Sequence, residues 1–146
     1  MSNRMTALLT SSLLLLGAAG VQAAMPETAT LYKNPSCMCC DGYAEHLKAK
    51  GLDVEVIEDQ ELSQVKMDAG VPHGQGSCHT VMLGEYVIEG HVPFAAIDKL
   101  FDERPDVDGI ALAGMPSGTP GMPGPKQAPY EVMSFENREA SPFVTL

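Results

Sequence analysis

The spacing of apolar residues predicts four strands and three helices between residues 30 and 104. Short apolar or alternating runs, typical of strands, lie at 30–33, 53–58, 80–83 and 86–88. Apolar residues three and four apart, typical of amphipathic helices, lie at 43–47, 62–69 and 94–101. Gly84 and Glu85 separate the last two strands and predict a tight hairpin turn.

This order of elements, βαβαββα, predicts a thioredoxin-like α/β fold. The expected core, at about residues 29–108, is a four-stranded mixed sheet with flanking helices. A Gly/Pro/Met-rich C-terminal extension follows at 109–146, with a loop from 114 to 129 and a further strand near 130–135. The length of 146 residues fits one domain, which we expect to span residues 25–146.

The N-terminal segment has the pattern of a secretory signal peptide. Arg4 precedes an apolar run, 7–21, and small residues follow at Ala23 and Ala24. The run is shorter than the ~20 residues that span a bilayer. We therefore expect residues 1–24 to be removed on export, leaving a protein outside the cytoplasm with no membrane attachment.

The charge of the chain excludes one class of partner. Nine basic and 19 acidic residues give a formal net charge of -10. Such a chain repels phosphate backbones, so we expect no nucleic-acid partner.

The four cysteines carry the clearest chemical signal. Three form the run Cys37-Met38-Cys39-Cys40 at the expected start of the first helix, where backbone N–H groups and the helix dipole favour thiolates. The fourth, Cys78, precedes the third strand, at the place where a thioredoxin-like redox enzyme usually carries a proline. If the elements align in this way, Cys78 lies beside the other three.

Three uses of these cysteines remain open. An exported protein with an even number of cysteines can use them as structural disulfides, although such crowded cysteines would not close long loops. A dithiol redox activity would use Cys37 as nucleophile and Cys40 as resolving thiol. The missing proline and the extra thiols count against that activity and favour the third use, a metal site.

Ligand chemistry favours copper over zinc at such a site. Thiolates and thioethers select Cu(I), and Met115 and Met122 repeat a Gly-Met-Pro tripeptide in the C-terminal loop. Four thiolates around one Cu(I) would leave a net charge of -3, whereas several Cu(I) ions with bridging thiolates would neutralise more of it. One Zn(II) would leave -2, so zinc stays a weaker alternative. We expect more than one copper ion.

Two histidines are candidate ligands beside the sulfurs. His79 adjoins Cys78, and His91 follows the fourth strand just before a helix. His73, in the loop before Cys78, is a further candidate donor, and His46 is expected on the surface of the first helix.

Four stretches of the chain form a combined pattern. They are Tyr32-Lys33-Asn34-Pro35-Ser36-Cys37-Met38-Cys39-Cys40, Ser77-Cys78-His79-Thr80, Tyr86-Val87-Ile88-Glu89-Gly90-His91-Val92-Pro93 and Gly114-Met115-Pro116-Ser117-Gly118-Thr119-Pro120-Gly121-Met122. Together they resemble the CopG family of periplasmic copper-resistance proteins. The resemblance implies a thioredoxin-like fold, a periplasmic location and copper binding through the four cysteines. It implies His79, His91 and the loop methionines as additional candidates.

The resemblance also implies a role beside copper efflux or detoxification systems, with copper ions and copper efflux or chaperone proteins as partners. Redox interconversion of Cu(I) and Cu(II) is a further activity that it suggests. We therefore expect an exported copper-binding protein of copper resistance. The alternatives are a thiol-disulfide or copper oxidoreductase that uses Cys37 and Cys40, and a small interaction module held by disulfides.

Overall fold

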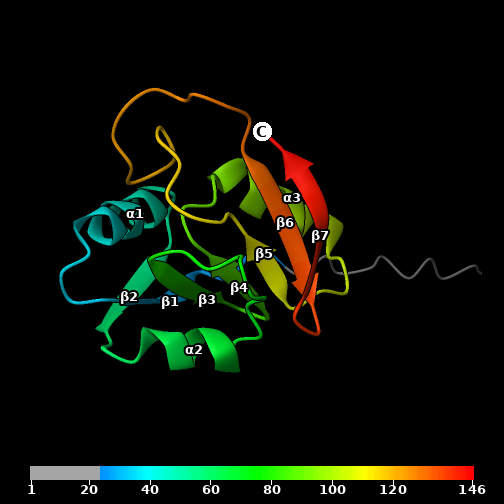
Figure 1. The fold of residues 1–146 in the computed structure, drawn as a ribbon, viewed down its shortest axis with the longest axis horizontal. Coiled ribbons are helices and arrows are strands. Elements are labelled where there is room, and N and C mark those ends of the chain that lie inside the picture. The colour runs from blue at the N-terminus through cyan, green and yellow to red at the C-terminus, as the bar shows by residue number, and fades with distance from the viewer. Residues whose placement is uncertain (1–23) are drawn as a thin grey trace, which may run out of the picture.

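The computed structural model describes residues 24–146 (Figure 1). Of the predicted signal peptide, residues 1–24, only Ala24 is among them, so that prediction lies outside the described residues. Within the described part, no helix combines the length and the apolar character needed to cross a membrane.

Residues 24–146 form one mixed sheet and three helices. The strands are β1 (Thr28–Lys33), β2 (Asp53–Glu58), β3 (His79–Leu83), β4 (Tyr86–Glu89), β5 (Gly109–Ala111), β6 (Glu131–Glu136) and β7 (Glu139–Thr145). The helices are α1 (Met38–Ala49), α2 (Leu62–Asp68) and α3 (Phe94–Glu103). Each strand and helix predicted between residues 30 and 104 is therefore confirmed, and so is the strand near 130–135.

The predicted number of strands in the sheet is wrong. The sheet has seven strands in the order β2-β1-β3-β4-β5-β6-β7, because the C-terminal extension continues the sheet. β5 pairs in parallel with β4, and β6 and β7 add antiparallel strands at that edge (yellow, orange and red in Figure 1). The thioredoxin-like arrangement of the four strands β1 to β4 stays a prediction from the element order.

Alternation along the strands divides the apolar residues between two faces of the sheet. On one face Leu31, Val81 and Ile88 pack with residues of α1 and α3, including Tyr43 and Leu100. On the other face a smaller cluster of Val87, Ala111 and Phe135 lies with Met82 and Ala69. Figure 1 shows α1 and α3 on one side of the sheet and α2 on the other.

The first helix and the third strand start close together, which brings the cysteines to one place. β1 and β3 are antiparallel, and Lys33 at the end of β1 pairs with His79 at the start of β3. The chain leaves β1 through a turn, and α1 begins at Met38. Cys37 to Cys40 and Cys78 therefore lie at the same end of these neighbouring strands.

Candidate metal and thiol centre

The N-terminus of α1 carries three of the four cysteines. Cys37 is the residue before the first helical turn, and its side chain makes no hydrogen bond that caps the helix. Cys40 is fully buried, while Cys37 and Cys39 are half-buried. The predicted position of the cysteine run at a helix start is confirmed.

The fourth sulfur lies beside the other three. Cys37 and Cys40 form a disulfide, and Cys39 and Cys78 are free thiols. The Sγ of Cys39 lies 3.5 Å from that of Cys37 and 3.7 Å from that of Cys78. The four sulfurs lie within 4.8 Å of one another, a spacing that allows them to share a metal ion.

Cys78 also belongs to a second group, with two imidazoles. Its Sγ lies 3.0 Å from Nε2 of His91 and 3.5 Å from Nδ1 of His79. These three ligand atoms also lie within 4.8 Å of one another. Cys78 is thus the sulfur that the two candidate ligand groups share.

A backbone contact fixes the orientation of His91. Its Nδ1 lies 2.7 Å from the carbonyl oxygen of Pro120, so Nδ1 carries the proton and donates it. Nε2 is then left with a lone pair that faces Cys78. Histidines that bind metals commonly donate their other ring nitrogen in this way.

Burial keeps His79, His91 and Cys78 neutral through shifts in their pKa values. Burial first, and then the nearby His91 and Lys66, lower the pKa of His79 to about 3. Burial also lowers the pKa of His91. The pKa of Cys78 rises to about 11, first because of desolvation and then because of the neighbouring Cys39. Without a cation, the centre therefore holds neutral imidazoles and a protonated Cys78 thiol.

The chemistry of the donors fits a soft metal ion. His79 is fully buried, yet its Nε2 has no hydrogen-bond partner, which is costly for a polar atom away from water. A neutral imidazole and adjacent thiols are ligands that Cu(I) and Zn(II) accept once the thiols lose their protons. The centre thus offers sulfur and imidazole ligands in a partly buried environment.

The predicted methionine ligands lie on a loop that contacts the centre through its backbone. The carbonyl of Gly114, next to Met115, accepts a hydrogen bond from the Ser77 hydroxyl. At Gly121, next to Met122, an added Cβ would lie 2.4 Å from the carbonyl oxygen of Cys39. The Met115 side chain is 53% exposed and that of Met122 is half-buried. Their roles as ligands stay predictions.

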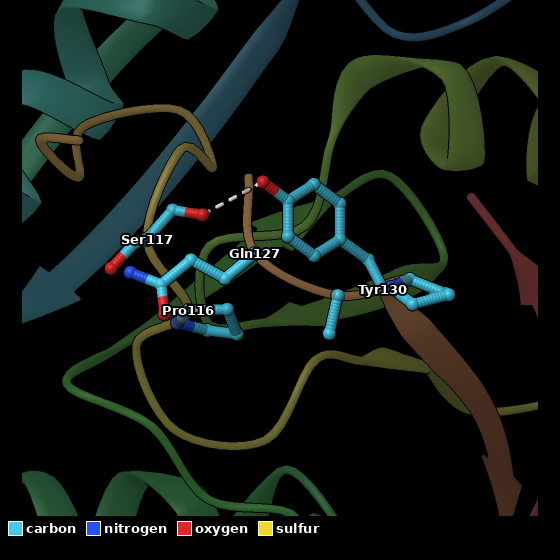
Figure 2. A pocket seen from close by; sticks show the side chains of 6 residues that line it. Pro116, Ser117, Gln127 and Tyr130 are labelled. Atoms are coloured by element: carbon cyan, nitrogen blue, oxygen red, sulfur yellow. Dashed lines mark hydrogen bonds between the residues drawn. The ribbon is translucent and has the colours of Figure 1, made fainter. Parts of the chain in front are cut away.

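A tyrosine from the C-terminal extension holds the same loop from its other side. Figure 2 shows Tyr130 beside Pro116, Ser117 and Gln127, where its hydroxyl donates a hydrogen bond of 2.8 Å to the Ser117 carbonyl. Tyr130 precedes β6, so the added strands connect the methionine loop to the sheet.

The two remaining histidines lie outside these groups. His73 is exposed and belongs to neither candidate ligand group. His46 was expected on the surface, but it is half-buried, with its ring 6.5 Å from Tyr43 and 6.4 Å from Phe94.

Sequence reasoning missed three contributors to this centre. Glu89 is buried and bonds the backbone of Ser77, and the Pro120 carbonyl orients His91. Tyr43 lies against both imidazoles, with ring centroids 4.4 Å from His79 and 5.6 Å from His91. A carboxylate directly after the apolar run of β4 was the available signal for Glu89, whereas a backbone carbonyl leaves no signal in the sequence.

Known proteins resemble this chain at the level of both sequence and fold. Residues 75–122 match a family described as "Protein of unknown function, DUF411". No curated protein sequence matches the chain. Two solved structures, titled "Copper resistance protein copG" Form 2 and Form 1, are each 38% identical, with TM-scores of 0.76 and 0.75. The alignments cover 83% of this chain and 98% of the solved chains. With these matches and its Cys37-Met38-Cys39-Cys40 motif, the chain belongs to the CopG family of copper resistance proteins.

Proposed function

We propose that this protein binds more than one Cu(I) ion in a cluster bridged by the thiolates of Cys37, Cys39, Cys40 and Cys78. The observation that carries the proposal is the place of Cys78, whose Sγ lies 3.7 Å from that of Cys39 and 3.0 Å from His91 Nε2. A sulfur shared by two ligand groups is suited to bridge two ions. His79, His91, Met115 and Met122 are the proposed additional ligands.

Charge supports several Cu(I) ions over one metal ion. Each thiol that binds Cu(I) loses its proton, so a reduced centre gathers up to four negative charges in a partly dry place. An excess of buried negative charge is costly, and each added Cu(I) removes one unit of it. Zinc remains the less favoured metal, because the proposed thioether ligands suit Cu(I) better.

Copper binding by all four sulfurs requires the Cys37–Cys40 disulfide to open. Two electrons and two protons convert this disulfide into two thiols, whose thiolates then become available to Cu(I). A reducing partner or a small thiol must supply those electrons. The oxidised centre offers only the Cys39 and Cys78 sulfurs, so we expect it to hold less copper.

Anaerobic reconstitution tests this proposal. The chain is reduced, loaded with Cu(I), desalted and analysed for copper, and X-ray absorption identifies the ligands. We expect more than one copper per chain and a spectrum dominated by sulfur. A Met67→Leu variant is the control for a methionine outside the site and should bind as much copper as the parent. Met67 is 48% exposed on α2 and belongs to neither ligand group. A reproducible ratio of one or less would overturn the polynuclear site.

The disulfide favours a second candidate, a thiol-disulfide or copper oxidoreductase. In the copper reaction, the Cys37 and Cys40 thiolates each give one electron to a separate Cu(II) ion, which leaves the disulfide and two Cu(I) ions. In the protein reaction, Cys37 attacks a partner disulfide and Cys40 resolves the mixed disulfide. A Cys40→Ala variant that traps mixed disulfides with partner proteins, or insulin reduction by the unmodified chain, would support the protein reaction.

The family and the N-terminal pattern support a proposal about the cellular setting. We propose export to the periplasm, where the protein takes up copper and stores it or passes it to copper efflux or chaperone proteins. Mass spectrometry of the mature protein from a periplasmic extract tests the location. We expect an N-terminus at residue 24 or 25.

A further inference from the structure

A buried carboxylate lies next to the proposed copper site without belonging to it. The side chain of Glu89, at the end of β4, is fully buried. Its Oε1 accepts hydrogen bonds from the Lys66 ammonium at 2.5 Å and from the backbone N–H of Ser77 at 2.6 Å. Its Oε2 accepts one from the Thr80 hydroxyl at 2.7 Å. The Lys66 ammonium also donates to the Thr80 hydroxyl at 2.9 Å.

Such an arrangement is a poor means of stabilising a fold. Removing a carboxylate and an ammonium from water costs several kcal/mol per ion, and apolar residues of similar volume often serve stability as well or better. Here both oxygens of Glu89 are used, and one of them holds a backbone group in the segment before β3. The geometry of that segment is therefore what the carboxylate controls most directly.

That segment connects Glu89 to both ligand groups. Ser77 immediately precedes Cys78, and Glu89 lies two residues before His91. Between them Gly90 has φ +79°, and an added Cβ would lie 2.6 Å from the Ser77 Cβ and 2.6 Å from the Leu112 carbonyl oxygen. The Gly90 N–H also donates to the His79 carbonyl at 3.1 Å. The end of β4 and the Cys78 segment are thus in close contact, and Glu89 links them.

We infer that Glu89, neutralised by Lys66, is a positioning residue for the copper site: through the Ser77 N–H it holds Cys78 within reach of both Cys39 and His91. The inference rests on the proposed function and adds a residue that touches no metal ligand atom itself. Lys66 belongs to α2, on the face of the sheet opposite to α1 and α3 (Figure 1). This helix therefore also helps to position the copper site.

Two double variants isolate the hydrogen bond to Ser77. Glu89→Met with Lys66→Met replaces the ion pair by apolar side chains and leaves the Ser77 N–H without its acceptor. Glu89→Gln with Lys66→Met also removes both charges but keeps a carbonyl oxygen that can accept from Ser77. Thr80→Val is the matched control, since it removes the bond to Oε2 and the bond from Lys66 but leaves Oε1 of Glu89 bonded to the Ser77 N–H. Circular dichroism checks that each variant is folded.

The reactivity of Cys78 is the first measurement, made on reduced protein without copper. We expect alkylation of Cys78, relative to Cys39, to be at least fivefold faster in the Met/Met variant than in the parent. The Gln/Met variant and Thr80→Val should stay within twofold of the parent. Equal rates in the parent and a folded Met/Met variant would overturn the inference.

Copper loading is the second measurement and separates this inference from the proposed function. The Met/Met variant should lose at least one copper per chain, with recovery in the Gln/Met variant. If the parent itself binds no copper, the proposed function fails, while the alkylation rates still decide whether Glu89 positions Cys78. If the Met/Met variant does not fold, hydrogen exchange on the parent decides. A Ser77 N–H that exchanges as fast as the backbone N–H of His73, an exposed residue, would then overturn the inference.

Discussion

At the scale of single residues, His79 and His91 differ in the partners that the fold gives to their ring nitrogens. Both nitrogens of His91 have partners, the Pro120 carbonyl and the Cys78 sulfur. His79 is fully buried, but its Nε2 has none. An unpaired buried polar atom costs about 1–3 kcal/mol. His79 thus lowers the stability of the metal-free protein.

This contrast predicts opposite effects for the same substitution. His79→Leu should raise the free energy of unfolding of the metal-free protein by about 1 kcal/mol, because it removes the unpaired nitrogen. His91→Leu should lower it by about 1–3 kcal/mol, because the Pro120 carbonyl loses its donor. Urea unfolding measures both values. A loss of stability in His79→Leu as large as that in His91→Leu would contradict the prediction.

At the scale of elements, the loop at 114–122 is placed by close contact with α1. Gly121 has φ +81°, and a Cβ there would lie 2.4 Å from the Cys39 carbonyl oxygen and 2.8 Å from the Tyr43 backbone nitrogen. Both neighbours belong to the first helix and cannot move alone. The loop therefore reaches the cysteines only because residue 121 has no side chain.

Gly121→Ala should therefore displace the loop from the cysteine cluster. We expect the variant, loaded with Cu(I), to lose copper to a competing chelator at least tenfold faster than the parent, since the loop methionines and the Pro120 contact move away. Gly124→Ala is the control. Its φ of +88° gives a similar backbone strain, but its nearest new contact is 3.7 Å away. Equal rates for the two variants would mean that strain, not contact with α1, determines the loss.

Tyr130, which bonds the same loop at Ser117, should have a smaller effect on stability and on copper loss. Tyr130→Phe removes the hydroxyl that bonds the Ser117 carbonyl (Figure 2). The cost should be about 0.5–1.5 kcal/mol in the free energy of unfolding, the usual net value of one hydrogen bond. Thermal unfolding followed by circular dichroism measures it. Because Gly121 still holds the loop against α1, chelator-driven copper loss should change by less than threefold.

The limits of sequence-based prediction are clearest in these same elements. Strands β1 to β4 were predictable because each contains a short apolar or alternating run with turn residues beside it. β5 has only three residues, and five of the seven residues of β7 are exposed, so neither leaves a clear pattern. Cys78 was placed beside the other cysteines from element order alone. The contacts of Glu89 and Pro120 depend on backbone groups brought together by folding, which residue types do not encode.

At the scale of the whole molecule, the redox state of the centre and the proposed binding of copper should affect the free energy of unfolding by different amounts. The Cys37–Cys40 disulfide closes a very short loop, with a sequence separation of 3. The chain-entropy relation gives about 2 kcal/mol for a loop of that size. Copper that binds only the folded chain at a free concentration 1,000 times its Kd adds about 4 kcal/mol. Copper binding should therefore add more stability than reduction of the Cys37–Cys40 disulfide removes.

The position of Cys78 makes this effect testable. Cys37, Cys39 and Cys40 are close together even in an unfolded chain, so copper bound to them alone stabilises the fold little. Cys78 is 38 residues away from Cys40 in sequence and joins them only on folding. We expect Cu(I) in a chelator buffer to raise the Tm of the reduced parent by about 15 °C. Cys78→Ser should show less than half of that rise. An equal rise in both proteins would mean that copper binds the helix start alone and that the fold does not build the site.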